Sequence, residues 1–178
     1  QAVEALNRNL DLQIDDFATF NWKAVVDAVN ILGGVDVELS KAEFYYINAY
    51  ITETVEATGV GSYQLKQAGL NHLDGVQAVA YARLRKMDTD FARTERQREI
   101  IDLCFQKLKK SDFAVVNNVM EAVFPQILSS VTIDDIIPAA RNLTKYTIAD
   151  TMGFPAARSD ANMGKKGDCV IPQTLESN

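Results

Sequence analysis

The chain has little of the chemistry that most metal centres and nucleophilic active sites require. Its 178 residues include one histidine and two cysteines. His72 lies in the turn-rich stretch LNHLDG, and the two cysteines lack the close spacing of a zinc site. Neither GxxxxGK[ST] nor GxGxxG occurs, so the common nucleotide phosphate loops are absent. A Ser-His-Asp triad, a zinc site and a nucleotide site therefore have little support.

The two cysteines leave two possibilities open. Cys104 and Cys169 could form a disulfide, or both could be buried thiols. We prefer the thiols, because Cys104 falls on an apolar helical face, where a thiol behaves as a small hydrophobic group.

Long apolar runs and an excess of positive charge are also missing. No stretch approaches the roughly 20 residues of a membrane helix, and no signal peptide is visible. The net charge of −6 argues against general nucleic-acid binding. The hydrophobic content of 47% is ordinary for a globular protein, and the length allows one domain with a substantial core. The sequence begins within a helical pattern and stops just after an apolar, strand-like run, so we expect one domain that is incomplete.

The spacing of apolar residues predicts strands that alternate with helices, which favours an α/β fold. The predicted strands cover residues 12–20, 35–39, 146–153 and 169–172. The predicted helices cover residues 22–31, 40–59, 76–84, 91–109, 113–128 and 133–143, and residues 61–75 are expected to form turns. Asn21 is suited to cap the first of these helices, and two glycines after it end the helix.

Basic residues are concentrated in the stretch YARLRKMDTDFARTERQREI, residues 81–100. This stretch holds six basic side chains and four acidic ones, although the whole chain is acidic. At helical spacing, the apolar stripe of the helix at 76–84 continues into Arg83. The stripe of the next helix, which contains Ile100 and Cys104, continues back to Gln97 and Arg93, with Arg96 beside them. Asp90 is predicted to cap that helix and to leave its first-turn N–H groups near Arg93.

A single arginine at a helix end usually forms a surface salt bridge, here with Asp88, Asp90 or Glu95. Several converging arginines repel one another, and a guanidinium group cannot lose its proton to relieve the repulsion. A phosphate would relieve it, and the apolar stripes behind would suit an apolar tail. We therefore expect one pocket for a phosphorylated amphiphile, formed by Arg83, Arg85, Arg93 and Gln97. The expected groove for the tail is lined by Val79, Ile100 and Cys104.

Two blocks of the sequence resemble the LytR-CpsA-Psr family. They are FNWKAVVDAVNILGGVDVEL, residues 20–39, and LNHLDGVQAVAYARLRKMDTDFARTERQREII, residues 70–101. The resemblance implies a three-layer α/β/α sandwich around a mixed β-sheet. Residues 1–178 would be the C-terminal major part of one catalytic domain. That domain would lie on the extracellular face of the cell membrane, anchored by an N-terminal helix that this sequence does not contain.

The resemblance also implies an activity. The family's phosphotransferases move a glycopolymer of the teichoic acid or capsular polysaccharide type from a polyprenyl-pyrophosphate carrier to peptidoglycan or another cell-wall acceptor. Arg83 and Arg85 match the arginines that contact the pyrophosphate and would be the catalytic residues. The residues that match the rest of the substrate site are Asp90, Arg93, Arg96 and Gln97. Ala92 stands where the family usually has glycine, a mild departure on a helix.

One family signature is missing, and it bears on the cofactor. That signature supplies further arginines and the aspartate associated with Mg²⁺, and its place would be before Gln1. We therefore assign no metal ligand within the chain, and we expect residues 1–178 alone to be inactive. Two alternatives remain open: a non-catalytic module that binds polyprenyl phosphate, and a transcriptional attenuator, as early family members were described. The acidic composition argues against the second.

Overall fold

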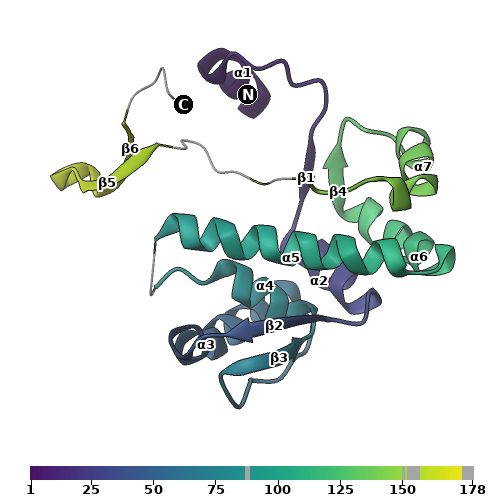
Figure 1. Cartoon of the computed structure of the whole chain (residues 1–178), viewed down its shortest axis with the longest axis horizontal. Coiled ribbons are helices and arrows are strands. Elements are labelled where there is room, and N and C mark those ends of the chain that lie inside the picture. The colour runs from purple at the N-terminus through teal and green to yellow at the C-terminus, as the bar shows by residue number, and fades with distance from the viewer. Residues whose placement is uncertain (87–88, 150, 152–156, 174–178) are drawn as a thin grey trace. The chain divides into compact units, whose positions relative to one another are not determined.

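The structure is a computed structural model that describes residues 1–86, 89–149, 151 and 157–173. The chain divides into two compact units, residues 1–147 and residues 148–178. The α/β class expected from the sequence is confirmed (Figure 1). The strands of the described residues pair as three two-stranded antiparallel sheets. No helix within these ranges is long and apolar enough to span a membrane.

The first unit is dominated by helices, with four short strands between them. Its helices are α1 (Ala2–Leu10), α2 (Trp22–Ile31), α3 (Lys41–Thr58), α4 (Gly75–Arg83), α5 (Asp90–Lys110), α6 (Phe113–Val123) and α7 (Ile133–Arg141). Its strands are β1 (Ala18–Phe20), β2 (Val35–Leu39), β3 (Gly69–Leu73) and β4 (Ile127–Ser129). Two short 3-10 helices, η1 (Phe124–Gln126) and η2 (Leu143–Lys145), complete the unit.

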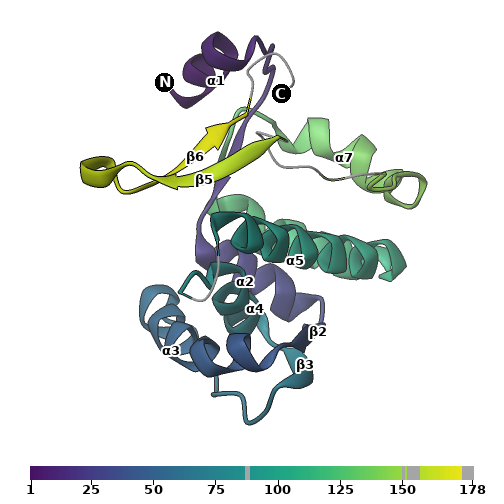
Figure 2. The same ribbon diagram turned by 60° about the vertical axis from the view of Figure 1, so that its left-hand side comes forward.

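Helix α4 lies at the centre of the first unit and packs against α2, α3 and α5 (Figures 1 and 2). Its residues from Gly75 to Tyr81 are all buried. Asp74 caps the helix by accepting a hydrogen bond from the Gln77 backbone N–H at 2.9 Å. Because Gly75 to Tyr81 are all buried, the body of α4 is held in place by the helices around it.

The strand predicted at residues 35–39 is confirmed as β2. Its inward positions, Val35, Val37 and Leu39, are buried, whereas the residues between them are exposed. Its partner is β3, with Val35 opposite Leu73. The turns predicted across residues 61–75 are therefore wrong at β3. Glycine, asparagine and histidine are poor strand formers, and the pairing with β2 overrides that local preference.

Strands β1 and β4 also depart from the expectation. Of the strand predicted at residues 12–20, only the last three residues, β1, are a strand. The helix predicted to reach residue 128 ends at Val123, because Pro125 lacks the N–H that would continue it. The chain then enters β4, which pairs antiparallel with β1.

The last elements are less regular than predicted. No strand forms at residues 146–149, and residues 150, 152 and 153 of that predicted strand lie outside the described residues. The second unit holds β5 (Arg158–Asn162), η3 (Gly164–Lys166) and β6 (Asp168–Pro172). Strand β6 confirms the strand predicted at residues 169–172, and it pairs with β5. Cys104 and Cys169 are each half-buried and belong to different units, so the preference for two thiols stays a prediction.

Candidate functional site

The junction between α4 and α5 carries most of the predicted site residues. Helix α4 ends at Arg83, and α5 begins at Asp90. Thr89, not Asp90, is the N-cap of α5, and its hydroxyl accepts a hydrogen bond from the Ala92 N–H at 3.4 Å. The prediction that Asp90 caps the helix is therefore wrong. Threonine and aspartate both suit a cap, and Asp90 instead faces two arginines.

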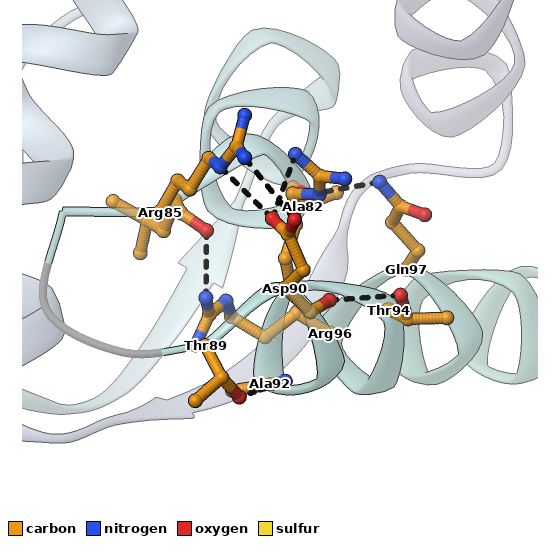
Figure 3. A network of polar contacts seen from close by, with 10 residues as sticks. Ala82, Arg85, Thr89, Asp90, Ala92, Thr94, Arg96 and Gln97 are labelled. Atoms are coloured by element: carbon orange, nitrogen blue, oxygen red, sulfur yellow. Dashed lines mark hydrogen bonds and ion pairs between the residues drawn. The ribbon is translucent and has the colours of Figure 1, made fainter. Parts of the chain in front are cut away.

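The Asp90 carboxylate meets two guanidinium groups (Figure 3). Arg85 approaches it with Nε at 2.8 Å from Oδ1 and Nη2 at 3.1 Å from Oδ2. Arg93, in the first turn of α5, places Nη1 at 3.3 Å from Oδ1. Two cations share one anion, so this cluster keeps one positive charge in excess. The Arg85 side chain is 61% exposed, so its pair with Asp90 is screened by water and contributes little to stability.

Gln97 lies near the same cluster, one helical turn after Arg93. Its Nε2 donates to the Ala82 carbonyl oxygen at 3.4 Å, as Figure 3 shows. Residues four apart share one face of a helix, so Gln97 and Arg93 face α4 together. The structure thus brings Arg85, Arg93 and Gln97 together around the end of α4.

Arg83 has a different set of neighbours, on α2 and α3. Its Nη1 donates to Thr54 Oγ1 at 2.7 Å, and its Nη2 donates to Glu53 Oε2 at 3.3 Å. Its guanidinium carbon lies 3.8 Å from the ring centroid of Trp22 and 5.7 Å from that of Tyr50. Arg83 is therefore anchored by contacts that none of the other predicted site residues share.

Arg96 points into the protein, with 5% of its surface exposed. Its Nη2 donates to the Leu84 carbonyl oxygen at 2.7 Å, and its Nη1 lies 3.6 Å from Glu43 Oε1. It thereby ties the end of α4 to α5 and α3. The contact with substrate expected for Arg96 stays a prediction, and the contacts that the structure shows are structural.

Tyr81 adds a second link between α4 and α5. Its hydroxyl donates to Glu99 Oε2 at 2.7 Å. Burial raises the pKa of Tyr81 above its ordinary value, and the hydrogen bond to Glu99 and the charge of Glu43 raise it further. The phenol therefore remains protonated and keeps donating its hydrogen bond at every physiological pH.

Two of the three residues predicted to line the apolar groove lie in the core, and the groove itself stays a prediction. Val79 and Ile100 are 4% and 3% exposed and belong to the closed core, and Cys104 packs against that core. A hollow of about 490 Å³ lies elsewhere, beside Trp22. Its walls are Phe20, Asn21, Trp22, Lys23, Ala57 and Thr58.

The magnesium ion expected with the substrate stays a prediction. Among the described residues, no three histidine, cysteine, aspartate or glutamate side chains gather in one place. Asp90, the carboxylate in the arginine cluster, is already paired with Arg85 and Arg93. We derive no step through a metal, and the expectation of a ligand before Gln1 stays a prediction.

Sequence reasoning missed the residues that hold the arginines in place. Trp22, Thr54 and Glu43 each contact an arginine that lies at least 29 positions later in the chain. The sequence shows only that Trp22 directly follows the cap of α2. That position does not indicate that Trp22 contacts Arg83.

Comparison with known proteins identifies the family. The model of the LytR_cpsA_psr family matches residues 1–163. The chain belongs to the LytR_cpsA_psr family. An uncharacterized protein of Staphylococcus aureus is 30% identical over 141 residues, which cover 79% of this chain and 32% of that protein.

Two further proteins are similar to this chain. The Bacillus subtilis protein named polyisoprenyl-teichoic acid–peptidoglycan teichoic acid transferase TagV is 26% identical over 167 residues, which cover 92% of this chain and 40% of TagV. The crystal structure of protein gbs0355 from Streptococcus agalactiae has a TM-score of 0.70 at 21% identity, covering 99% of this chain and 57% of that one. This likeness shows a shared fold. The chain spans less than half the length of the curated relatives it matches.

Proposed function

We propose that this part of a LytR_cpsA_psr protein serves a phosphotransferase that moves a glycopolymer from a polyprenyl-pyrophosphate carrier to the cell wall. The glycopolymer would be of the teichoic acid or capsular type, and peptidoglycan or another wall polymer would accept it. Membership of the family and the name of TagV support the proposal. We place the reaction at the extracellular face of the membrane, where such carriers deliver their cargo.

The observation that carries the proposal is the pair of guanidinium groups on Asp90. Arg85 and Arg93 come from the two sides of the α4–α5 junction and meet with one positive charge in excess. The guanidinium fork matches phosphate oxygens, and arginine stays charged at any physiological pH. An anionic group of the carrier would supply the charge that Asp90 alone does not balance.

Each residue then has a defined part in the mechanism. Arg85 and Arg93 hold the pyrophosphate, and Arg83 donates to it from the α2–α3 side. These donors stabilise the negative charge that grows on the leaving lipid phosphate, so positioning and electrostatics do most of the work. A carboxylate repels phosphate, so we assign Asp90 the task of orienting Arg85 and Arg93. Gln97 offers a neutral donor beside them.

The test is Arg85→Ala in the complete protein, assayed by transfer of labelled glycopolymer from its lipid carrier. Loss of one donor to a developing charge costs about 3 kcal/mol, so transfer should fall by on the order of a hundredfold. The Arg85 side chain is 61% exposed, so the free energy of unfolding should change by less than about 1 kcal/mol. Near-normal transfer with a melting temperature several degrees lower would contradict the proposal.

Arg96→Ala is the matched comparison, because it removes an arginine whose side chain is buried. It should cost about 3 kcal/mol of unfolding free energy, because the Glu43 carboxylate and the Leu84 carbonyl lose a partner. Urea denaturation measures the difference between the two variants. Carrier binding without transfer in the complete protein would instead favour a non-catalytic binding module.

A further inference from the structure

The guanidinium group of Arg83 is held from several directions before any ligand arrives. Thr54, which is fully buried, donates its own hydroxyl hydrogen to the Tyr50 carbonyl oxygen at 2.7 Å. A lone pair of that hydroxyl therefore faces Arg83 and accepts its Nη1–H at 2.7 Å. Glu53 accepts a second N–H at 3.3 Å. Arginine has five N–H donors, so three remain for a ligand.

Trp22 covers one face of this guanidinium group. The guanidinium carbon lies 3.8 Å from the ring centroid, which is the contact distance of a stacked cation–π pair. Trp22 is the first residue of α2, and its backbone is fixed by the Asn21 cap, which accepts from the Ala24 N–H at 2.8 Å. The backbone that carries the ring is thus anchored independently of Arg83.

The other contacts of Arg83 do not fix its orientation as firmly. The Glu53 side chain is 55% exposed, so its ion pair is screened and weak. Thr54 fixes one nitrogen but leaves the plane of the group free to turn about that hydrogen bond. A flat aromatic face is what sets the plane, and through it the direction of the remaining donors.

We propose that Trp22 is a positioning residue that holds the plane of Arg83 ready for the pyrophosphate of a polyprenyl carrier. The inference rests on the proposed function, in which Arg83 donates to that group. Ordering a long side chain before binding removes an entropic cost that the ligand would otherwise meet. The ring also keeps water from one face of the guanidinium, which strengthens its attraction to an anion.

The chain offers a direct reporter for this contact. Trp22 is its single tryptophan, so tryptophan emission, excited at a wavelength where tyrosine does not absorb, and any fluorinated tryptophan report on this position alone. The ring is 46% exposed and lines the hollow of about 490 Å³. A change at Arg83 should therefore alter the surroundings of the indole.

The first experiment needs no ligand. Arg83→Ala should shift the emission spectrum of Trp22, because the cation stacked on the ring is lost. Arg85→Ala serves as the control and should leave the emission unchanged, since Arg85 pairs with Asp90. Equal spectra for the wild type and Arg83→Ala would overturn the stacked arrangement.

The second experiment titrates farnesyl pyrophosphate, a short soluble polyprenyl pyrophosphate, against the chain. Trp22→Leu should weaken binding about threefold to tenfold, and Trp22→Phe should restore most of it. Fluorinated tryptophans, which keep the shape but withdraw ring electrons, should weaken binding stepwise with each added fluorine. Tyr45→Leu, which removes an aromatic ring that is 79% exposed, is the matched control and should bind as the wild type does.

The outcomes separate the inference from the proposed function. Weak binding by Arg83→Ala together with normal binding by every Trp22 variant would overturn the positioning role alone. Normal binding by Arg83→Ala, or no binding by the wild type, would overturn both the contact proposed for Arg83 and the role of Trp22. Thermal melts followed by circular dichroism show which variants fold. If Trp22→Leu does not fold, the fluorinated tryptophans still test the role of the ring, because they keep its shape.

Discussion

Arginines that look equivalent along the chain have different surroundings in the structure. Arg85 is largely exposed and pairs with Asp90, whereas Arg96 is buried against Leu84 and Glu43. Arg83 stacks on an aromatic ring. Burial therefore decides which arginine is free to serve a ligand and which one serves the fold.

At the scale of single residues, Tyr81→Phe should change how stability depends on pH. The pKa of Tyr81 is raised in the folded state, chiefly by burial, whereas in the unfolded chain it is about 10. Below pH 10 both states hold the proton, so its contribution to stability is fully present. Above pH 10 the unfolded chain loses the proton while the folded chain keeps it, so the wild type loses up to about 1.4 kcal/mol per pH unit.

Urea denaturation of the wild type and Tyr81→Phe between pH 8 and pH 11 measures this effect. At pH 8 the variant should be less stable by about 1 kcal/mol, because the hydrogen bond to Glu99 is lost. The difference should shrink as the pH rises above 10. Parallel curves for the two proteins would show that Tyr81 titrates normally in the folded state.

At the scale of elements, the site depends on how closely α4 approaches α2. Gly75 opens α4, and its backbone N–H donates to Asn30 Oδ1 at 2.7 Å. A Cβ atom at Gly75 would lie 2.1 Å from the Val26 carbonyl oxygen, which belongs to the backbone of α2. Only glycine allows this approach, which places the far end of α4 and the arginines that follow it.

Gly75→Ala should therefore destabilise the first unit by about 3 kcal/mol, because neither backbone can move aside without strain. Gly61→Ala is the control, since a Cβ there meets nothing within 4 Å. That change should be neutral or stabilise the protein by up to about 1 kcal/mol. Equal denaturation midpoints for the two variants would mean that α2 and α4 can separate freely.

At the scale of the whole molecule, the apolar core formed by the described residues lies within the first unit. Its buried cluster extends from Val26 to Ile100 in the sequence. The second unit consists of the β5–β6 hairpin and its turn among the described residues. A two-stranded hairpin alone contributes little independent stability, so cooperative unfolding should be a property of the first unit.

Ending the chain after Thr147 should therefore preserve cooperative unfolding, with a denaturant midpoint close to that of the full chain. Circular dichroism during urea denaturation compares the two chains. A truncated chain that unfolds gradually would show that residues 148–178 are needed for the core.

The sequence by itself determined the features that depend on near neighbours. The helix at 22–31 and its Asn21 cap, and the alternating strand at 35–39, are confirmed. So is the placement of Arg83 and Arg93 on two separate helices. Each of these features depends on the spacing of apolar residues and on capping residues within a few positions. Both can be read directly from the sequence.

Only the tertiary structure decided the features that depend on distant partners. Strand β3 exists because β2 pairs with it, and β4 exists because β1 does. Thr89 caps α5, and Asp90 pairs instead with Arg85, which precedes the helix. The burial of the Arg96 side chain and the stacking of Arg83 on Trp22 likewise depend on partners far away in the sequence. Local patterns contain no information about such partners, because packing alone brings them within contact.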